Sequence, residues 1–195
     1  MNESAHVAEE VFLGLGSNQG DRLGELRRAA AALAAHARLE LTAWSRIWET
    51  EPVGPEVQDA FLNACVAVRT DLSPLELLDE LKRQEAAAGR APGSHLKPRP
   101  IDLDILLFGG QVIAVGRLAV PHPELRNRAF VLEPLAEIAG TIRLPDSGET
   151  IDEACAKIRR KAGPWVRLYD GGDLQTQVPG ANKEERGAAL ALYRR

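Results

Sequence analysis

The chain has 195 residues, a length that suits one domain of ordinary size, with or without a short appendage. Hydrophobic residues make up 45% of it, enough for a packed core, and the formal net charge is -4 at pH 7. Proteins that bind nucleic acid through surface charge carry a basic stripe, so this balance argues against that class.

Two cysteines, Cys65 and Cys155, lie in apolar surroundings and lack the C-x-x-C spacing of redox and zinc motifs. We expect two reduced, buried thiols, as is usual in a cytosolic protein. The first ten residues, MNESAHVAEE, contain no apolar segment of the kind that a signal peptide needs. No apolar run approaches the length that crosses a bilayer. We therefore expect a cytoplasmic protein with no membrane contact.

The predicted elements begin with a short apolar strand at Val11–Leu15. A helix follows from Asp21 to about Ala37, where apolar residues recur at helical spacing. Leu39–Trp48 is predicted to be a strand, and Glu49–Glu56, ETEPVGPE, a loop rich in proline and glycine. Phe61–Thr70 alternates well enough for another strand.

A second helix starts at Ser73, with proline at its first position and glutamate three residues after the serine, and it ends at Gly89. The basic loop Arg90–Pro100 then leads into a strand, and Val112–Val120 is predicted to be a further strand. The remaining expected elements are a segment that turns helical within Pro121–Ala139, a helix at Ile151–Arg160, and a stretch at Trp165–Tyr169 that packs on the core.

This β-α-β-β-α-β order, with an extra strand and helices, matches the ferredoxin-like plan of α+β folds. Helices then cover one face of a mostly antiparallel sheet, and the other face is open to solvent or substrate. We expect one domain over residues 1–170, with its core from about residue 11, and a polar tail over residues 171–195.

The strand in Arg99–Gly110, RPIDLDILLFGG, is apolar except for Asp102 and Asp104. Carboxylates are costly to bury unless they are paired or bind a metal. Residues two apart in a strand point to the same face, roughly 6.5–7 Å apart. Such a pair suits one or two Mg²⁺ ions, which take a few carboxylates together with waters and substrate phosphates. The alternative is a pair of surface charges on an edge strand.

Basic residues bracket this strand in the sequence: Arg90, Lys97 and Arg99 before it, and Arg117, His122, Arg126 and Arg128 after it. Any one of them could be a solvated loop charge, but together with a metal they are what phosphoryl transfer needs. The imidazole of His122 either donates to a phosphate or only fixes a loop.

The stretch FLGLGSNQG does not predict a nucleotide-binding loop. Gln19 stands where a G-x-G-x-x-G motif needs glycine, and no G-K-[ST] follows. We expect a tight turn there, with Ser17 or Asn18 capping the first helix.

Phe61 and Phe130 could clamp a flat ring, and the amide of Asn63 could meet a heterocycle edge, although phenylalanine in a strand is more often core. Backbone groups from Thr50 to Gly54 could contact the same ring. The residues thus predict a Mg²⁺-dependent phosphoryl or pyrophosphoryl transferase without a P-loop.

Several stretches together resemble the 6-hydroxymethyl-7,8-dihydropterin pyrophosphokinases of folate biosynthesis. They are LGLGSNQGDR (13–22), ETEPVG (49–54), FLNACV (61–66), LKRQEAAAGR (81–90), PRPIDLDILLFG (98–109) and VPHPELRNRAFVLEPLAEIA (120–139). The D-L-D-I strand combined with V-P-H-P-x-x-x-x-R-x-F is highly specific, and the resemblance covers most of residues 11–169.

The resemblance implies a ferredoxin-like enzyme that moves the terminal pyrophosphate of ATP onto the hydroxymethyl group of the pterin, leaving AMP. By position, two Mg²⁺ ions bind Asp102 and Asp104, and Arg90 and Arg99 act on the phosphates. ATP contacts are implied for Glu85, Arg99, Ile105, Arg117, His122 and Arg128. Pterin contacts are implied for Thr50, Pro52, Val53, Phe61, Asn63 and Phe130.

The chain departs from the family pattern in the loop before the Asp strand. After Gly89-Arg90 the second arginine of the family's G-R-x-R is missing, and Leu96-Lys97 replaces Trp-Gly. Loops of this kind close over substrates. A binding module without chemistry is the alternative that this loop favours, and RNA binding on an open sheet is a weaker one. We expect a monomer, with contacts to other folate-pathway enzymes left open.

Overall fold

The computed structural model describes residues 8–52, 58–90, 97–161 and 163–174. Its strands are β1 (Glu9–Ser17), β2 (Leu39–Trp44), β3 (Trp48–Thr50), β4 (Phe61–Thr70), β5 (Asp102–Phe108), β6 (Ile113–Val115), β7 (Leu118–Val120) and β8 (Val166–Leu168). Its helices are α1 (Arg22–Ala35), α2 (Pro74–Ala87), α3 (Ala129–Ala139), α4 (Ile151–Ile158) and the 3-10 helix η1 (Leu125–Asn127). No helix within these ranges is long and apolar enough to cross a membrane.

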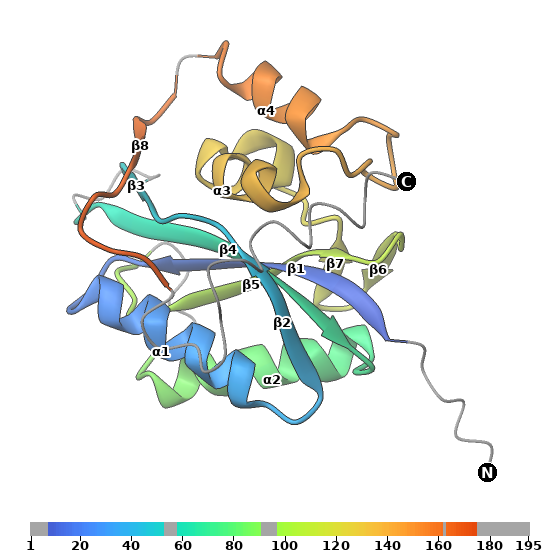
Figure 1. The fold of residues 1–195 in the computed structure, drawn as a ribbon, viewed down its shortest axis with the longest axis horizontal. Helices are drawn as coiled ribbons and strands as arrows, with labels where there is room; N and C mark the ends of the chain where they lie inside the picture. Colours follow the sequence, from blue (N-terminus) through green and yellow to red (C-terminus); the bar gives the residue numbers. More distant parts are fainter. Residues whose placement is uncertain (1–7, 53–57, 91–96, 162, 175–195) are drawn as a thin grey trace.

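The main sheet has the strand order β5-β1-β4-β3-β8, with β2 also paired to β4 (Figure 1). Every pairing in it is antiparallel. The expected strand at Leu39–Trp48 is split into β2 and β3, and both halves pair with β4. With β2 and β3 taken as one strand, the order is that of a ferredoxin-like fold, so the predicted fold class is confirmed.

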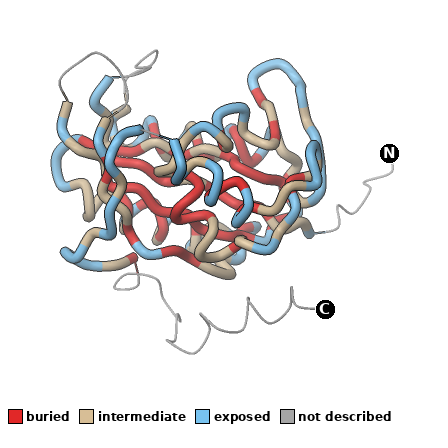
Figure 2. The backbone as a smooth tube through the Cα atoms, turned by 90° about the horizontal axis from the view of Figure 1, so that it is seen from above, coloured by how far each residue is buried: buried red, intermediate tan, exposed pale blue. Residues whose placement is uncertain are grey.

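The two faces of the sheet have separate cores. Leu13 and Leu103 pack with Leu26 and Leu81 of α1 and α2, below the sheet in Figure 1. The opposite face carries α3 and α4 (Figure 1), and Figure 2 shows the buried stretches gathered in the middle of the molecule. The second face was expected to be open, and this is wrong where α3 covers it. Strand periodicity could not show this, because the covering helix comes later in the chain.

A register shift between β1 and β5 accounts for the apolar end of β5. The pairing moves by one residue between Phe12 and Leu13, and Leu106 is the extra residue on β5. Leu106 and Leu107 are therefore both buried in the core on the α3 side. The pleat stays regular nearer the start of β5, where Asp102 and Asp104 share one face.

The start of α2 is confirmed, and the start of α1 is different from the prediction. Ser73 accepts from the Glu76 backbone N–H, and the Glu76 carboxylate accepts from the Ser73 N–H, which completes a capping box. The cap of α1 is Asp21, which accepts from the Gly24 N–H. Neither Ser17 nor Asn18 caps it, because β1 continues to Ser17 and both side chains are buried.

Two further expectations on the second half of the chain are corrected. Val112–Val120 is not one strand but the hairpin β6–β7, which turns at Gly116 with φ of +52°. The domain boundary after residue 170 comes too early, because Leu174 is 1% exposed and packs in the core beside α1. Residues 175–195 lie outside the described residues. Both cysteines are free and buried, as expected.

Candidate active site

A pocket lies between the sheet and the start of α3. Residues of β1, β4 and β5 form its floor, and His122 and the first turn of α3 form its rim. The sequence-predicted residues that line it are Thr50, Phe61, Asn63, Arg99, Asp102, Asp104, His122, Arg128 and Phe130. The fold therefore brings the predicted phosphate groups and the predicted ring-binding groups into one cavity.

The two aspartates of β5 reach the pocket beside glycines of β1. Asp102 pairs across the sheet with Gly16, and Asp104 with Gly14. Both glycines line the pocket. A Cβ on Gly16 would lie only 3.0 Å from Oδ1 of Asn63. The lack of a side chain at Gly16 thus leaves space in the pocket beside Asn63 and Asp102.

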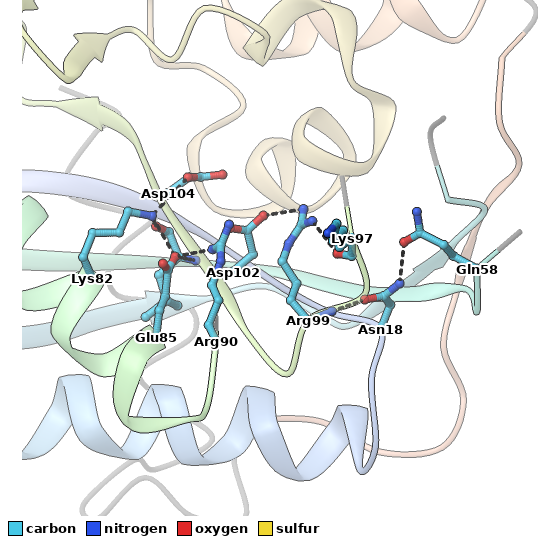
Figure 3. Close-up of polar contacts among 10 residues, drawn as sticks. Asn18, Gln58, Lys82, Glu85, Arg90, Lys97, Arg99, Asp102 and Asp104 are labelled. Atoms are coloured by element: carbon cyan, nitrogen blue, oxygen red, sulfur yellow. Dashed lines mark hydrogen bonds and ion pairs between the residues drawn. The ribbon is translucent and has the colours of Figure 1, made fainter. Parts of the chain in front are cut away.

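The two carboxylates have unequal partners (Figure 3). Asp102 is paired through Oδ1 with Arg90 and through Oδ2 with Arg99, the latter at 2.7 Å. Burial by itself would raise the pKa of Asp102, but the charges of Arg99 and Arg90 outweigh it and hold the pKa below its ordinary value. Burial and the charge of Asp102 raise the pKa of Asp104. The ion pair of Asp104 is a long one, 4.0 Å from its Oδ1 to Nζ of Lys82.

Glu85 of α2 lies behind this pair and anchors Arg90. Its side chain is 5% exposed. Its Oε1 accepts from the Leu103 N–H at 2.7 Å and from Lys82 Nζ at 2.7 Å, and lies 2.8 Å from a guanidinium nitrogen of Arg90. Arg90 is thereby held between two carboxylates, Glu85 and Asp102 (Figure 3).

Each aromatic ring of the pocket has a guanidinium beside it. The Arg99 group lies 5.2 Å from the centroid of Phe61, and the Arg128 group lies 5.6 Å from the centroid of Phe130. Cations at these distances are attracted to the ring face. The ring-binding part of the pocket is therefore continuous with its cationic part.

The polar side of the ring-binding part is formed by Asn63 and Thr50. Nδ2 of Asn63 donates to Oγ1 of Thr50 at 2.9 Å, and both residues are buried. This bond fixes the orientation of the amide, whose remaining donor and acceptor capacity can meet a polar heterocycle.

His122 presents one ring nitrogen to the pocket. Its Nδ1 accepts from the Glu124 N–H at 3.2 Å, and its own backbone N–H donates to the Leu106 carbonyl at 3.0 Å. Burial lowers the pKa of His122, and the charge of Arg128 adds to this, against the opposing effect of Asp104. A neutral ring with Nδ1 as acceptor carries its proton on Nε2, so His122 is assigned as a donor.

The family model of 7,8-dihydro-6-hydroxymethylpterin-pyrophosphokinase (HPPK) matches residues 12–140. The chain belongs to this family. The expected class, an ATP-dependent pyrophosphokinase of folate biosynthesis, is therefore confirmed.

Relatives named 2-amino-4-hydroxy-6-hydroxymethyldihydropteridine pyrophosphokinase share much of the sequence. The Bacillus subtilis protein is 43% identical over 164 residues, 84% of this chain and 95% of that protein. The Methylorubrum extorquens protein is 45% identical over 148 residues, 76% of this chain and 92% of that protein. A Pisum sativum relative, 42% identical over 133 residues, is named a mitochondrial folate synthesis bifunctional protein, and the matched part is 68% of this chain and 26% of that protein.

Solved structures share the fold. The Plasmodium falciparum wild-type HPPK-DHPS with pterin and p-hydroxybenzoate superposes with a TM-score of 0.63 at 16% identity. The match covers 80% of this chain and 42% of that one, so the chain spans less than half of the solved fusion protein.

Some residues that the resemblance placed at ATP do not reach the pocket of this HPPK chain. Ile105 is 3% exposed and packs on the α1 and α2 side, because its side chain points opposite to that of Asp104. Arg117 is exposed and paired with Asp79 of α2. Glu85 touches Arg90 and not the pocket, as described above.

Other expected contacts are also outside the lining. Arg126 pairs with Asp146 and Glu149, so it is a structural cation near α4. Pro52 is partly buried and does not line the pocket. Val53 lies outside the described residues.

The sequence analysis missed residues that support the site. Asn18 accepts from the Arg99 N–H at 2.9 Å through Oδ1 and donates to Gln58 Oε1 at 3.1 Å, so it joins the segments on both sides of the pocket (Figure 3). The G-x-G of β1 is neither a nucleotide-binding loop nor a turn, and its two glycines lie opposite Asp104 and Asp102 in the sheet. The contact of Lys82 with Glu85 could have been predicted, because the two residues lie three apart on a predicted helix.

Proposed function

We propose that this pocket transfers the terminal pyrophosphate of Mg²⁺-ATP to 6-hydroxymethyl-7,8-dihydropterin. The hydroxymethyl oxygen forms a bond to the β-phosphorus, and the bond from that phosphorus to the oxygen bridging to the α-phosphorus breaks. AMP leaves with the bridging oxygen, and the hydroxyl proton passes to solvent. The observation that carries the proposal is that the Asp102–Asp104 pair, with its guanidinium partners, adjoins Phe61 and Phe130 in one pocket.

Asp102 and Asp104 would hold the two Mg²⁺ ions. No group of three or more His, Cys, Asp and Glu side chains converges for a metal in the part of the chain that the structure describes. Two carboxylates alone fit Mg²⁺, which completes its shell with waters and substrate phosphates. The raised pKa of Asp104 reflects a burial and repulsion that a cation would relieve. A Mg²⁺ ion held by these carboxylates would offset the negative charge of the phosphates.

Arg90 and Arg99 would stabilise the phosphates during transfer. Both are paired with Asp102, and a cation that competes for this carboxylate would leave their guanidinium groups free to pair with phosphate oxygens. Nε of Arg99 is buried and has no hydrogen-bond partner among the described residues. An unpaired buried donor in the pocket lining supports an acceptor that comes from a ligand.

His122 and Arg128 would bind the polyphosphate from the rim. The Nε2 proton of His122 can be donated to a phosphate oxygen, and the lowered pKa keeps the ring neutral so that it donates without changing charge. Arg128 adds a fixed charge on the same side. ATP-binding roles for Ile105 and Arg117 find no support in the pocket lining, since neither residue belongs to it.

Phe61 and Phe130 would sandwich the pterin, because they reach the same pocket from β4 and from α3. Asn63 and Thr50 lie beside them and offer polar groups to the ring edge. Pterin contacts of Pro52 and Val53 stay predictions.

A monomer and a cytoplasmic location also stay predictions. The bifunctional names of the Pisum sativum and Lactococcus lactis relatives support contact with another folate enzyme as a proposal for this chain.

The test is incubation with Mg²⁺-ATP and 6-hydroxymethyl-7,8-dihydropterin, followed by separation of the nucleotides. AMP formed one-for-one with a pterin diphosphate is the expected result. ADP in place of AMP would contradict pyrophosphoryl transfer. Nucleotide binding without turnover would support the binding module, the alternative that the changed loop between Arg90 and Arg99 favours.

A further inference from the structure

Lys82 of α2 contacts the polar network behind the carboxylate pair, and nothing in the sequence analysis assigned it a role. Its Nζ donates to Glu85 Oε1 at 2.7 Å and to the Leu103 carbonyl at 3.1 Å, and it lies 4.0 Å from Asp104 Oδ1 (Figure 3). An ammonium has three N–H donors. Two of them are used by fixed acceptors, which directs the head of the side chain toward Asp104.

Leu103 is the residue between the two aspartates, and α2 binds both of its backbone polar groups. Its N–H donates to Glu85 and its carbonyl accepts from Lys82. β5 is the outer strand of the sheet, so these two groups point away from β1, toward the free edge. Within the described residues no strand pairs with that edge. The Lys82–Glu85 pair takes the place of a neighbouring strand at this point, and it fixes the backbone that carries both carboxylates.

The charges around the pair also depend on Lys82. Asp102 has Arg90 and Arg99 as partners, and Lys82 is the cation near Asp104 on the α2 side. Lys82 also shares Glu85 with Arg90. Loss of the ammonium would leave Glu85 with one cation fewer and Asp104 without its nearest ion pair in the described structure.

We propose that Lys82 is a positioning residue of this site, which sets the affinity of the Asp102–Asp104 pair for divalent cations and holds Arg90 through Glu85. The inference rests on the proposed function, because it assumes that this pair is where the metal binds. Lys82 acts through its neighbours and is not assigned a contact with substrate.

The test measures Mn²⁺ binding to the protein alone by the loss of the free-ion electron paramagnetic resonance signal, so it does not depend on turnover. Lys82→Met should bind Mn²⁺ about tenfold more tightly than wild type, because a positive charge close to Asp104 is gone. Lys82→Arg should return the affinity to near the wild-type value. In the kinetic assay Lys82→Met should lower kcat and leave KM for the pterin unchanged, because Arg90 is less well held.

Arg83→Met is the matched control. It removes one positive charge from the next position of α2, where Arg83 is 67% exposed and pairs with Glu80. Its Mn²⁺ affinity should equal that of wild type. Lys82→Gln is a second variant that keeps a donor for Leu103 and Glu85, in case Lys82→Met loses its fold, and it should also bind Mn²⁺ more tightly.

Two results would overturn the inference in distinguishable ways. Equal Mn²⁺ affinity in wild type, Lys82→Gln and Arg83→Met would overturn the role of Lys82 and leave the proposed function intact. A wild-type protein that takes up no Mn²⁺, even with an ATP analogue whose α,β-bridging oxygen is replaced by methylene, would overturn the proposed function together with the inference.

Discussion

The guanidinium of Arg99 forms an ion pair with Oδ2 of Asp102 at 2.7 Å, on a carboxylate that a metal ion would take. The other oxygen of Asp102 is paired with Arg90. A cation that binds Asp102 would compete with these guanidinium groups for the carboxylate, and a polyphosphate bound with the cation would offer them other oxygens to pair with. Metal and nucleotide are then linked through the same two arginines.

This linkage predicts that metal and nucleotide bind cooperatively. The affinity for Mn²⁺ should rise at least about tenfold when the α,β-methylene ATP analogue is present, and by reciprocity Mn²⁺ should tighten the analogue by the same factor. Arg99→Ala should bind Mn²⁺ alone more tightly and lose much of the coupling. Isothermal titration in both orders of addition measures the effect. Equal Mn²⁺ affinity with and without the analogue would contradict the exchange.

The carboxylate pair itself predicts a loss of activity with the fold retained. Asp102→Asn and Asp104→Asn should each lower AMP formation about a thousandfold, because the charge that holds the metal at the phosphates is removed. Melting temperatures should stay within about 4 °C of wild type, since asparagine still accepts hydrogen bonds. Asp71→Asn, on an exposed carboxylate that pairs with Arg38, is the control with unchanged turnover. A pyrophosphokinase that stays active without either carboxylate would need another metal site.

The sequence predicted the parts of the fold that depend on local signals. Ser73 and Glu76 form the expected capping box, and the two-residue period of β5 directs Asp102 and Asp104 to one face. Arg126 and Arg128 show the limit of such signals. They are two residues apart and chemically identical, but the turn into α3 directs Arg126 to Asp146 and Arg128 to the pocket.

Contacts between distant segments could not be predicted in the same way. The position of Glu85 between Leu103 and Arg90 depends on how α2 packs against β5, which no spacing along the chain reports. The coverage of the second sheet face has the same origin, because α3 follows the whole ferredoxin-like unit in the sequence. The sequence named many of the residues that line the pocket, but it also named Ile105 and Arg117, which lie outside the lining, and it did not predict the hydrogen bonds.

The close approach of Asn63 to Gly16 predicts that a side chain at this position disturbs mainly the ring-binding part of the pocket. In Gly16→Ala the new Cβ would lie 3.0 Å from Asn63 Oδ1, so the amide has to shift away from its bond to Thr50. KM for the pterin should rise about tenfold, with a cost in stability of about 1–2 kcal/mol. Steady-state kinetics with each substrate varied in turn measures the change. Gly110→Ala is the control, because a Cβ there meets no atom within 4 Å, and its KM values should equal those of wild type.

The burial of Leu174 predicts that the stable domain needs residues beyond 170. Its side chain is 1% exposed, and the neighbouring Asp173 carbonyl accepts from Arg27 Nε at 2.8 Å. A chain that ends after residue 170 should be less stable than one that ends after residue 178 by about 2–3 kcal/mol, from the lost burial of one leucine and one hydrogen bond. Thermal melting of both truncations and of Leu174→Ala in the full chain tests this. Equal melting temperatures would restore the boundary expected from composition.

The raised pKa values of the two thiols predict that the cysteines of the native protein are modified slowly. Burial, with the charge of Glu133, raises the pKa of Cys155 to about 11, and burial with the charge of Glu137 raises the pKa of Cys65 further above its ordinary value. A thiol keeps its proton at any pH below its pKa. At pH 8 only about 0.1% of Cys155 is therefore thiolate. Reaction with dithionitrobenzoate at pH 8 should be at least about a hundredfold slower in the native protein than in guanidinium, where both thiols titrate normally. The native rate at Cys155 should climb as the pH approaches 11, and rapid labelling of either cysteine at pH 8 would show that its surroundings open in solution.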